Sequence, residues 1–134
     1  MGDERKLLPI MPPVKISLDG YVAGSPAAEK ERFNSAVVQV SEMFQEAIER
    51  LRTQNLHEQA GNFEVYRVML EDPITFYDAE DLIVSGSSAP QAVLDAYEKS
   101  ATSFESMREE YFFKRAKELR LVGNFLAKFI VDNF

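Results

Sequence analysis

The sequence predicts an all-α domain, a helical bundle of two helical hairpins with four to five helices and an extended N-terminal arm. Three observations predict it. Apolar residues recur at steps of three and four through most of the chain, a serine or aspartate beside a proline precedes several of these stretches, and glycine or asparagine falls between them. With 134 residues and 46% hydrophobic content, the chain can bury a core of its own.

Residues 1–24 differ in kind from the remainder. Pro9, Pro12 and Pro13 remove backbone donors, and the residues around them are compatible with short strands. We therefore expect an extended arm or linker over 1–24 and a helical domain over 25–134. The apolar side chains of the arm are Leu7, Leu8, Ile10, Val14, Ile16 and Leu18.

The first hairpin begins at Ser25, where a capping hydroxyl precedes Pro26. A long helix is expected from there, with a break between Thr53 and Asn62. A second helix follows and stops before Asp72. The apolar seam of the long helix consists of Phe33, Val37, Val40, Phe44, Ala47 and Leu51.

The later helices are expected to start at similar capping residues. Asp72 caps a short helix expected over Pro73–Val84, and Ser88 starts the next one. The last helix is expected from about Glu109 to near the C-terminus. The buried faces of these last two helices are expected to be Val93, Ala96, Tyr97, Ser100, Phe104 and Met107, and Phe112, Ala116, Leu119, Val122, Leu126 and Ile130.

Composition narrows the classes of function. The chain has no cysteine, which excludes disulfides, thiolate metal sites and a cysteine nucleophile. Its formal net charge of -7 disfavours nucleic acid and anionic membranes and favours a basic protein partner. No apolar run is long enough for a membrane span, and no signal peptide is apparent, so we expect a cytoplasmic protein.

No catalytic residue and no metal site are predicted. His57 is the sole histidine, and such a histidine is usually a surface or packing residue. Paired acids could bind a divalent cation or act as acid and base, but each pair is simpler to interpret as a solvated helix face or a helix start. These pairs are Glu71 with Asp72, Glu80 with Asp81, and Glu109 with Glu110.

Three blocks of residues resemble the helical subdomain of enzyme I, the phosphoenolpyruvate-protein phosphotransferase. They have the order and spacing of that family over roughly residues 29–129, which is most of the chain. The blocks are Glu29, Glu31, Arg32 and Phe33; Phe63, Glu64, Leu70, Glu71, Asp72 and Pro73; and Glu110, Tyr111, Phe112, Arg115, Ala116, Leu119, Arg120, Val122, Gly123 and Leu126.

The chain departs from the family pattern at several positions. Arg108 and Leu121 stand where aspartates are usual, and Tyr66 stands where many relatives have histidine. Ile74 follows Pro73 where acidic residues are common. The resemblance therefore implies a divergent member, in which local charge attraction is lower and apolar contact is greater.

The resemblance implies that the chain is a docking domain for HPr, the small phosphocarrier of the phosphotransferase system for sugar transport. The phosphorylated histidine belongs to a separate α/β subdomain and phosphoenolpyruvate to a barrel, so this chain would be a non-catalytic part of a transferase. It would hold no cofactor, and Mg²⁺ would be used in another domain. The partner-binding residues carried over by motif are Glu58, Val68, Met69, Thr102, Phe104, Tyr111, Phe112 and Arg115. Val68 and Met69 are expected to be exposed anchors, and Phe112 is either a third anchor or a core residue, because it also continues the apolar stripe of its helix.

Two other functions remain open from sequence. One is a stand-alone helical adaptor or regulatory interaction protein unrelated to sugar transport. The other is a small helical enzyme with a pocket of carboxylates and arginines, whose catalytic residues would look like ordinary helix surface.

Overall fold

The computed structural model describes Pro9, Met11 and residues 16–134, and this part of the chain contains five α-helices and no strand. The all-α prediction is therefore confirmed. The proposals made for the other residues of the arm lie outside the described residues. Residues 16–24 contain no helix and turn at Asp19 and Gly20 before the first helix begins. The helices are α1 (Pro26–Thr53), α2 (His57–Leu70), α3 (Pro73–Val84), α4 (Ala89–Glu105) and α5 (Glu110–Asn133).

The three helix starts predicted from proline and a capping side chain are confirmed. Ser25 Oγ accepts from the N–H of Ala28 at 3.1 Å at the start of α1. Asp72 and Ser88 make the same kind of bond at the starts of α3 and α4, at 3.0 and 3.3 Å. Each cap satisfies a backbone donor that the first turn of a helix leaves without a partner, and proline supplies a first turn that needs no donor.

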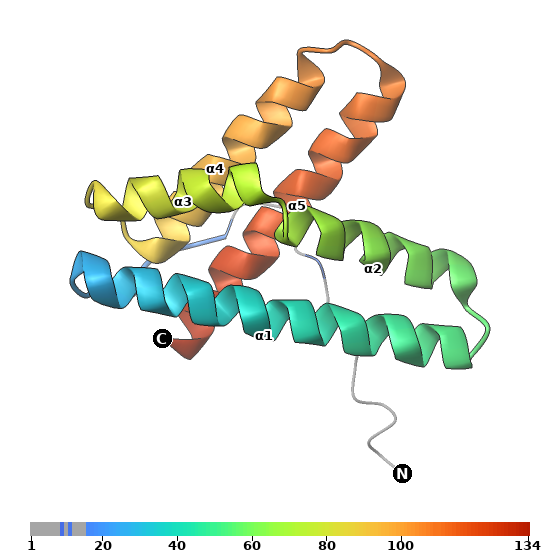
Figure 1. The fold of residues 1–134 in the computed structure, drawn as a ribbon, viewed down its shortest axis with the longest axis horizontal. Helices are drawn as coiled ribbons and strands as arrows, with labels where there is room; N and C mark the ends of the chain where they lie inside the picture. Colours follow the sequence, from blue (N-terminus) through green and yellow to red (C-terminus); the bar gives the residue numbers. More distant parts are fainter. Residues whose placement is uncertain (1–8, 10, 12–15) are drawn as a thin grey trace.

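The helices form two antiparallel hairpins that cross each other. In Figure 1, α1 runs beside α2, and the α4–α5 hairpin crosses them obliquely. The short helix α3 packs mainly on α4 and also on α1. The two predicted hairpins are thus α1 with α2 and α4 with α5, and α3 connects them.

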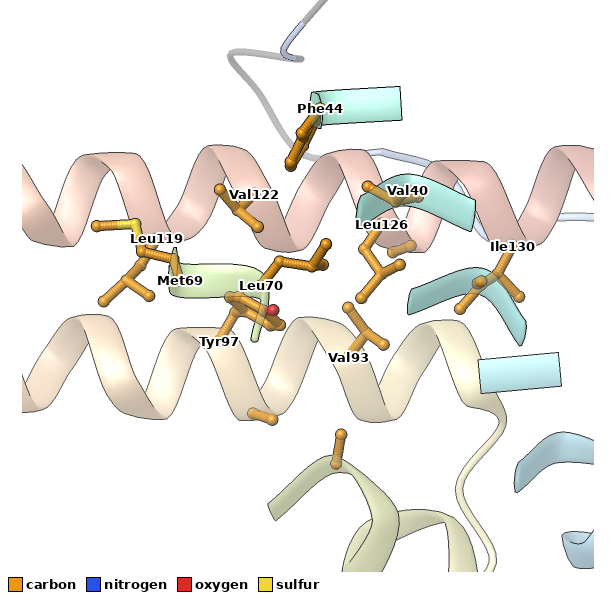
Figure 2. Packing of buried hydrophobic residues seen from close by; sticks show 14 of the residues in the cluster. Val40, Phe44, Met69, Leu70, Val93, Tyr97, Leu119, Val122, Leu126 and Ile130 are labelled. Carbon is orange, nitrogen blue, oxygen red and sulfur yellow. The ribbon is translucent and has the colours of Figure 1, made fainter. Parts of the chain in front are cut away.

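The core fills the crossing between the hairpins. Figure 2 shows Val40 and Phe44 of α1, Met69 and Leu70 of α2, and side chains of α4 and α5 meeting there. Phe44 is fully buried, and its ring lies 5.4 to 6.2 Å from those of Phe63, Tyr66 and Phe125. Burial of such aromatic side chains is a large part of the stabilisation of a domain of this size.

One predicted core position is wrong. The apolar pattern predicts Met107 on the buried face of α4, but α4 ends at Glu105 and Met107 is 48% exposed in the following turn. Phe112 is only half-buried, although it continues the apolar stripe of α5. The remaining positions predicted for α5 are all buried, namely Ala116, Leu119, Val122, Leu126 and Ile130.

None of the described helices combines the length and the apolar character needed to cross a lipid bilayer.

Candidate partner-binding groove

A groove of about 750 Å³ opens where α2, α3, α4 and α5 converge. The last turns of α2 form one wall, the start of α3 closes one end, and the adjoining ends of α4 and α5 form the other wall. Six of the eight residues proposed from the sequence line it, and the structure thus brings together positions from three helices. They are Val68, Met69, Phe104, Tyr111, Phe112 and Arg115.

Glu58 and Thr102 do not line the groove. Glu58 lies in the first turn of α2 and is exposed, about three helical turns from Val68 and Met69. Thr102 is exposed on α4, where its hydroxyl donates to Glu98 Oε2 at 3.3 Å. Motif alignment alone predicts both positions, and such an alignment cannot tell which side of a helix faces the groove.

The groove has an exposed apolar rim and a buried apolar floor. Val68 and Tyr111 of the rim are 68% and 59% exposed. Met69 is 8% exposed, and so it belongs to the floor and not to the exposed anchors proposed from the sequence. Phe112 is half-buried and makes an edge-to-face contact with Phe104, their ring centroids 5.7 Å apart. The geometry of the pair fixes the orientation of both rings beside the opening.

Arg115 is held in place at the side of the groove. Its guanidinium lies over the ring of Tyr111, 5.0 Å from the centroid, and Nη1 donates to the carboxylate of Glu118, which is 8% exposed. Burial lowers the pKa of Arg115, but its interactions with Tyr111 and Glu118 outweigh burial and hold that pKa above the ordinary value. The arginine therefore stays charged and presents a fixed planar surface beside Tyr111.

Polar groups at the end of the groove belong to the start of α3. Asp72 Oδ2 accepts from both the N–H and the hydroxyl of Thr75, each at 3.0 Å. The Thr75 hydroxyl, which is 2% exposed, also lies 2.8 Å from Ser100 Oγ. These bonds tie α3 to α4 and give the groove a rigid end.

Sequence reasoning named Ile74 only as a source of greater apolar contact, and it missed other residues of the groove. Ile74, 70% exposed, extends the apolar rim, and Val65 and Leu119 extend the lining. Ile74 carried a signal, because this aliphatic side chain stands where the resemblance would place an acidic residue. Ser100 and Ser103 gave no signal, since serine on a helix is common on any solvated face.

The histidine and the acidic residues considered as a general base or as metal ligands do not come together in one site among the described residues. His57 is exposed at the start of α2. Over the same part of the chain, no three side chains from histidine, cysteine, aspartate and glutamate gather closely enough to hold a metal ion. The prediction of no catalytic residue stays a prediction.

Known proteins resemble this chain in sequence and in fold. The chain is 31% identical over 113 residues to the phosphoenolpyruvate-protein phosphotransferase of Staphylococcus carnosus, covering 81% of this chain and 19% of that protein. It is 30% identical over 107 residues to the Escherichia coli protein named phosphoenolpyruvate-dependent phosphotransferase system, covering 80% of this chain and 14% of that protein. The chain thus spans less than a fifth of the length of these curated relatives.

The fold has a solved counterpart. An NMR solution structure of Enzyme I superposes with a TM-score of 0.67 at 27% sequence identity, covering 92% of this chain and 48% of that one. The family described as PEP-utilising enzyme, N-terminal, matches residues 7–115. This match covers most of the chain and includes α1 to α4 and the start of α5. All six of the predicted residues that line the groove fall within it, and Arg115 is the last residue matched. The chain belongs to the family of PEP-utilising enzyme N-terminal domains and corresponds to the helical part of enzyme I.

Proposed function

We propose that this chain is the HPr-docking helical domain of an enzyme I-like protein in a cytoplasmic phosphotransferase system. In this proposal it binds the phosphocarrier and does not carry the phosphorylated histidine. That histidine, the phosphoenolpyruvate site and Mg²⁺ would belong to α/β and barrel domains of the whole protein, and this chain would hold no cofactor.

One observation carries the proposal. Six residues chosen from family motifs, and separated by up to 47 positions from Val68 to Arg115, line one groove. A groove with aromatic and aliphatic lining and an arginine at its side has the composition of the centre of a protein interface. The acidic balance of the chain, 22 acidic against 15 basic residues, also suits a basic partner at long range.

An NMR titration tests the proposal. The ¹⁵N-labelled chain is titrated with HPr from the same organism, and amide shifts are followed to millimolar partner, since a transient complex has modest affinity. We expect perturbations at Val68, Tyr111, Phe112 and their neighbours and none at Val38, an exposed valine of α1 that does not line the groove. The absence of any perturbation around Val68 and Phe112 at millimolar HPr would exclude the docking role and favour the adaptor function.

A further inference from the structure

The α4–α5 hairpin has a base that packs in the bundle and a tip that projects from it (Figure 1). We call residues 102–115 the tip. None of them is buried, whereas Ala101 and Ala116 on either side of the tip are fully buried. α4 is tied to α3 by Ser100 and by Lys99, which both precede the tip. Because segments with little buried surface open at low cost in free energy, the tip is the part of the hairpin that should open most easily.

The first turn of α5 belongs to the tip and lacks a side-chain cap. Glu109 is its N-cap residue, and the Glu109 side chain makes no hydrogen bond to the first turn. The starts of α1, α3 and α4 all have such a bond. Arg108, directly before Glu109, has a left-handed φ of 57°. The local sequence thus adds little stability here, and contacts between α4 and α5 have to hold the tip closed.

A ring contact and an ion pair join the two helices across the tip. Phe104 of α4 and Phe112 of α5 have their ring centroids 5.7 Å apart. Arg120, in the base of α5, donates from Nη1 and Nη2 to the carboxylate of Glu105 at 2.6 and 3.0 Å. The same guanidinium donates from Nε and Nη2 to the carboxylate of Glu98, in the base of α4, at 2.9 and 2.8 Å. Arg120 therefore contacts the base and the tip of α4 at once.

The geometry of Arg120 makes this ion pair stronger than an ordinary exposed pair. Most exposed ion pairs contribute little to stability, and bidentate pairs of arginine with carboxylates are the exception. The contact with Glu98 orients the planar guanidinium, so less conformational freedom is lost when Glu105 meets it. The hydrogen bond from Arg120 also holds the pKa of Glu105 below its ordinary value, and Glu105 is therefore charged at neutral pH.

From these contacts we infer that the tip opens and closes as a unit and that Arg120 holds it closed. When the tip opens, Glu105 leaves Arg120 while the base of the hairpin stays packed in the bundle. The consequence for the groove rests on the proposed function. The tip forms most of the groove wall that α4 and α5 supply, so this wall is movable, whereas Met69 in the opposite wall is fixed in the core. Arg120 is then a positioning residue for the movable wall.

Native-state hydrogen exchange of the chain alone, followed by NMR at neutral pH and in low urea, tests the inference. The amides of Ser106 and Phe113 report on the tip, and those of Tyr97 and Leu126 report on the base. We expect the two tip amides to share one equilibrium constant for opening, about tenfold or more above that of the base. This constant should depend little on urea, because opening the tip exposes little surface.

Two variants remove the ion pair from either side. Glu105→Gln and Arg120→Gln should each speed exchange in the tip by about fivefold, since charge-assisted hydrogen bonds are stronger than neutral ones. Lys128→Gln is the matched control, because Lys128 also forms an ion pair on α5, with Asp132, but far from the tip. It should change exchange in the tip by less than about twofold. A residue that only stabilised the whole domain would behave like this control, since its contacts persist when the tip alone opens.

Two results would overturn the inference. One is a tip whose opening constant equals that of the base, which would mean that the tip opens only when the whole domain unfolds. The other is exchange in the tip of Glu105→Gln and Arg120→Gln that matches the Lys128→Gln control. The measurement does not involve HPr, so a failure of HPr to bind would reject the proposed function and leave this inference in place.

Discussion

Gly123 of α5 lies against Tyr97 of α4 so closely that a Cβ atom at Gly123 would stand 2.6 Å from the Cβ and 2.8 Å from the Cγ of Tyr97. Both atoms belong to the rigid start of a side chain that is 4% exposed. We expect Gly123→Ala to lower the free energy of unfolding by about 1–3 kcal/mol, because the helices must move apart. Urea unfolding followed by circular dichroism measures this change.

Gly61→Ala is the matched control. Gly61 also lies inside a helix, α2, but a Cβ atom there would meet nothing within 4 Å. Alanine is the better helix former, so this variant should raise the free energy of unfolding by up to about 1 kcal/mol. If Gly123→Ala is as stable as Gly61→Ala, the close α4–α5 contact is not what requires glycine.

Glu29 is a buried carboxylate that fastens the segment before α1 to the start of α4. Its Oε1 accepts from Tyr21 Oη at 2.9 Å and from the N–H of Ala89 at 2.8 Å, and its Oε2 accepts from the N–H of Gly24 and from Arg32, both at 2.9 Å. Glu29→Gln replaces one accepting oxygen by a donor that faces two other donors. We expect it to lower the free energy of unfolding at neutral pH by roughly 2–4 kcal/mol, measured by urea titration.

The same carboxylate gives a pH dependence. Burial raises the pKa of Glu29, but the hydrogen bonds from Ala89, Gly24 and Tyr21 and the positive charge of Arg32 outweigh burial and hold the pKa below its ordinary value of 4.5. The Glu29 carboxylate therefore stabilises the fold above about pH 4.5. This contribution is lost as the pH falls through the pKa that Glu29 has in the folded state, which is lower than its ordinary value. The difference between the natural chain and Glu29→Gln should shrink below that pH.

Glu31→Gln on the same helix is the control for both measurements. Glu31 is exposed, so its variant should differ from the natural chain by less than about 0.5 kcal/mol at neutral pH. A Glu29→Gln variant that behaves like Glu31→Gln would mean that the buried network contributes no net stability.

Local signals explain why so much of the fold could be predicted from sequence. Ser25, Asp72 and Ser88 each cap a helix within four residues of a proline, so these helix starts can be predicted without knowing what packs on them. The apolar residues that recur along α1 and α5 lie on one face of each helix, and that face packs against the core. Such consistency between local pattern and global packing is typical of natural sequences.

The groove was harder to predict because α2 is apolar on more than one side. Val68 and Met69 are adjacent, yet one is 68% exposed and the other 8%. Periodicity cannot decide which of two neighbours faces the core when both are apolar. The hydrogen-bond network of Glu29 could not be predicted from the sequence either. The bond between Glu29 and Ala89 joins residues 60 positions apart, and no short motif indicates it.

The turn between α4 and α5 offers a stabilising change. Arg108 has φ 57°, a left-handed conformation that costs a residue with a side chain roughly 1 kcal/mol, and its side chain is exposed. Arg108→Gly should therefore raise the free energy of unfolding by up to about 1 kcal/mol, whereas Arg108→Ala, which keeps the Cβ, should not. Asn55, with φ 62° in the α1–α2 turn, already has a side chain suited to this conformation, so Asn55→Ala should lower stability. Equal stability of the glycine and alanine variants at position 108, measured in urea, would show that the turn stores no strain.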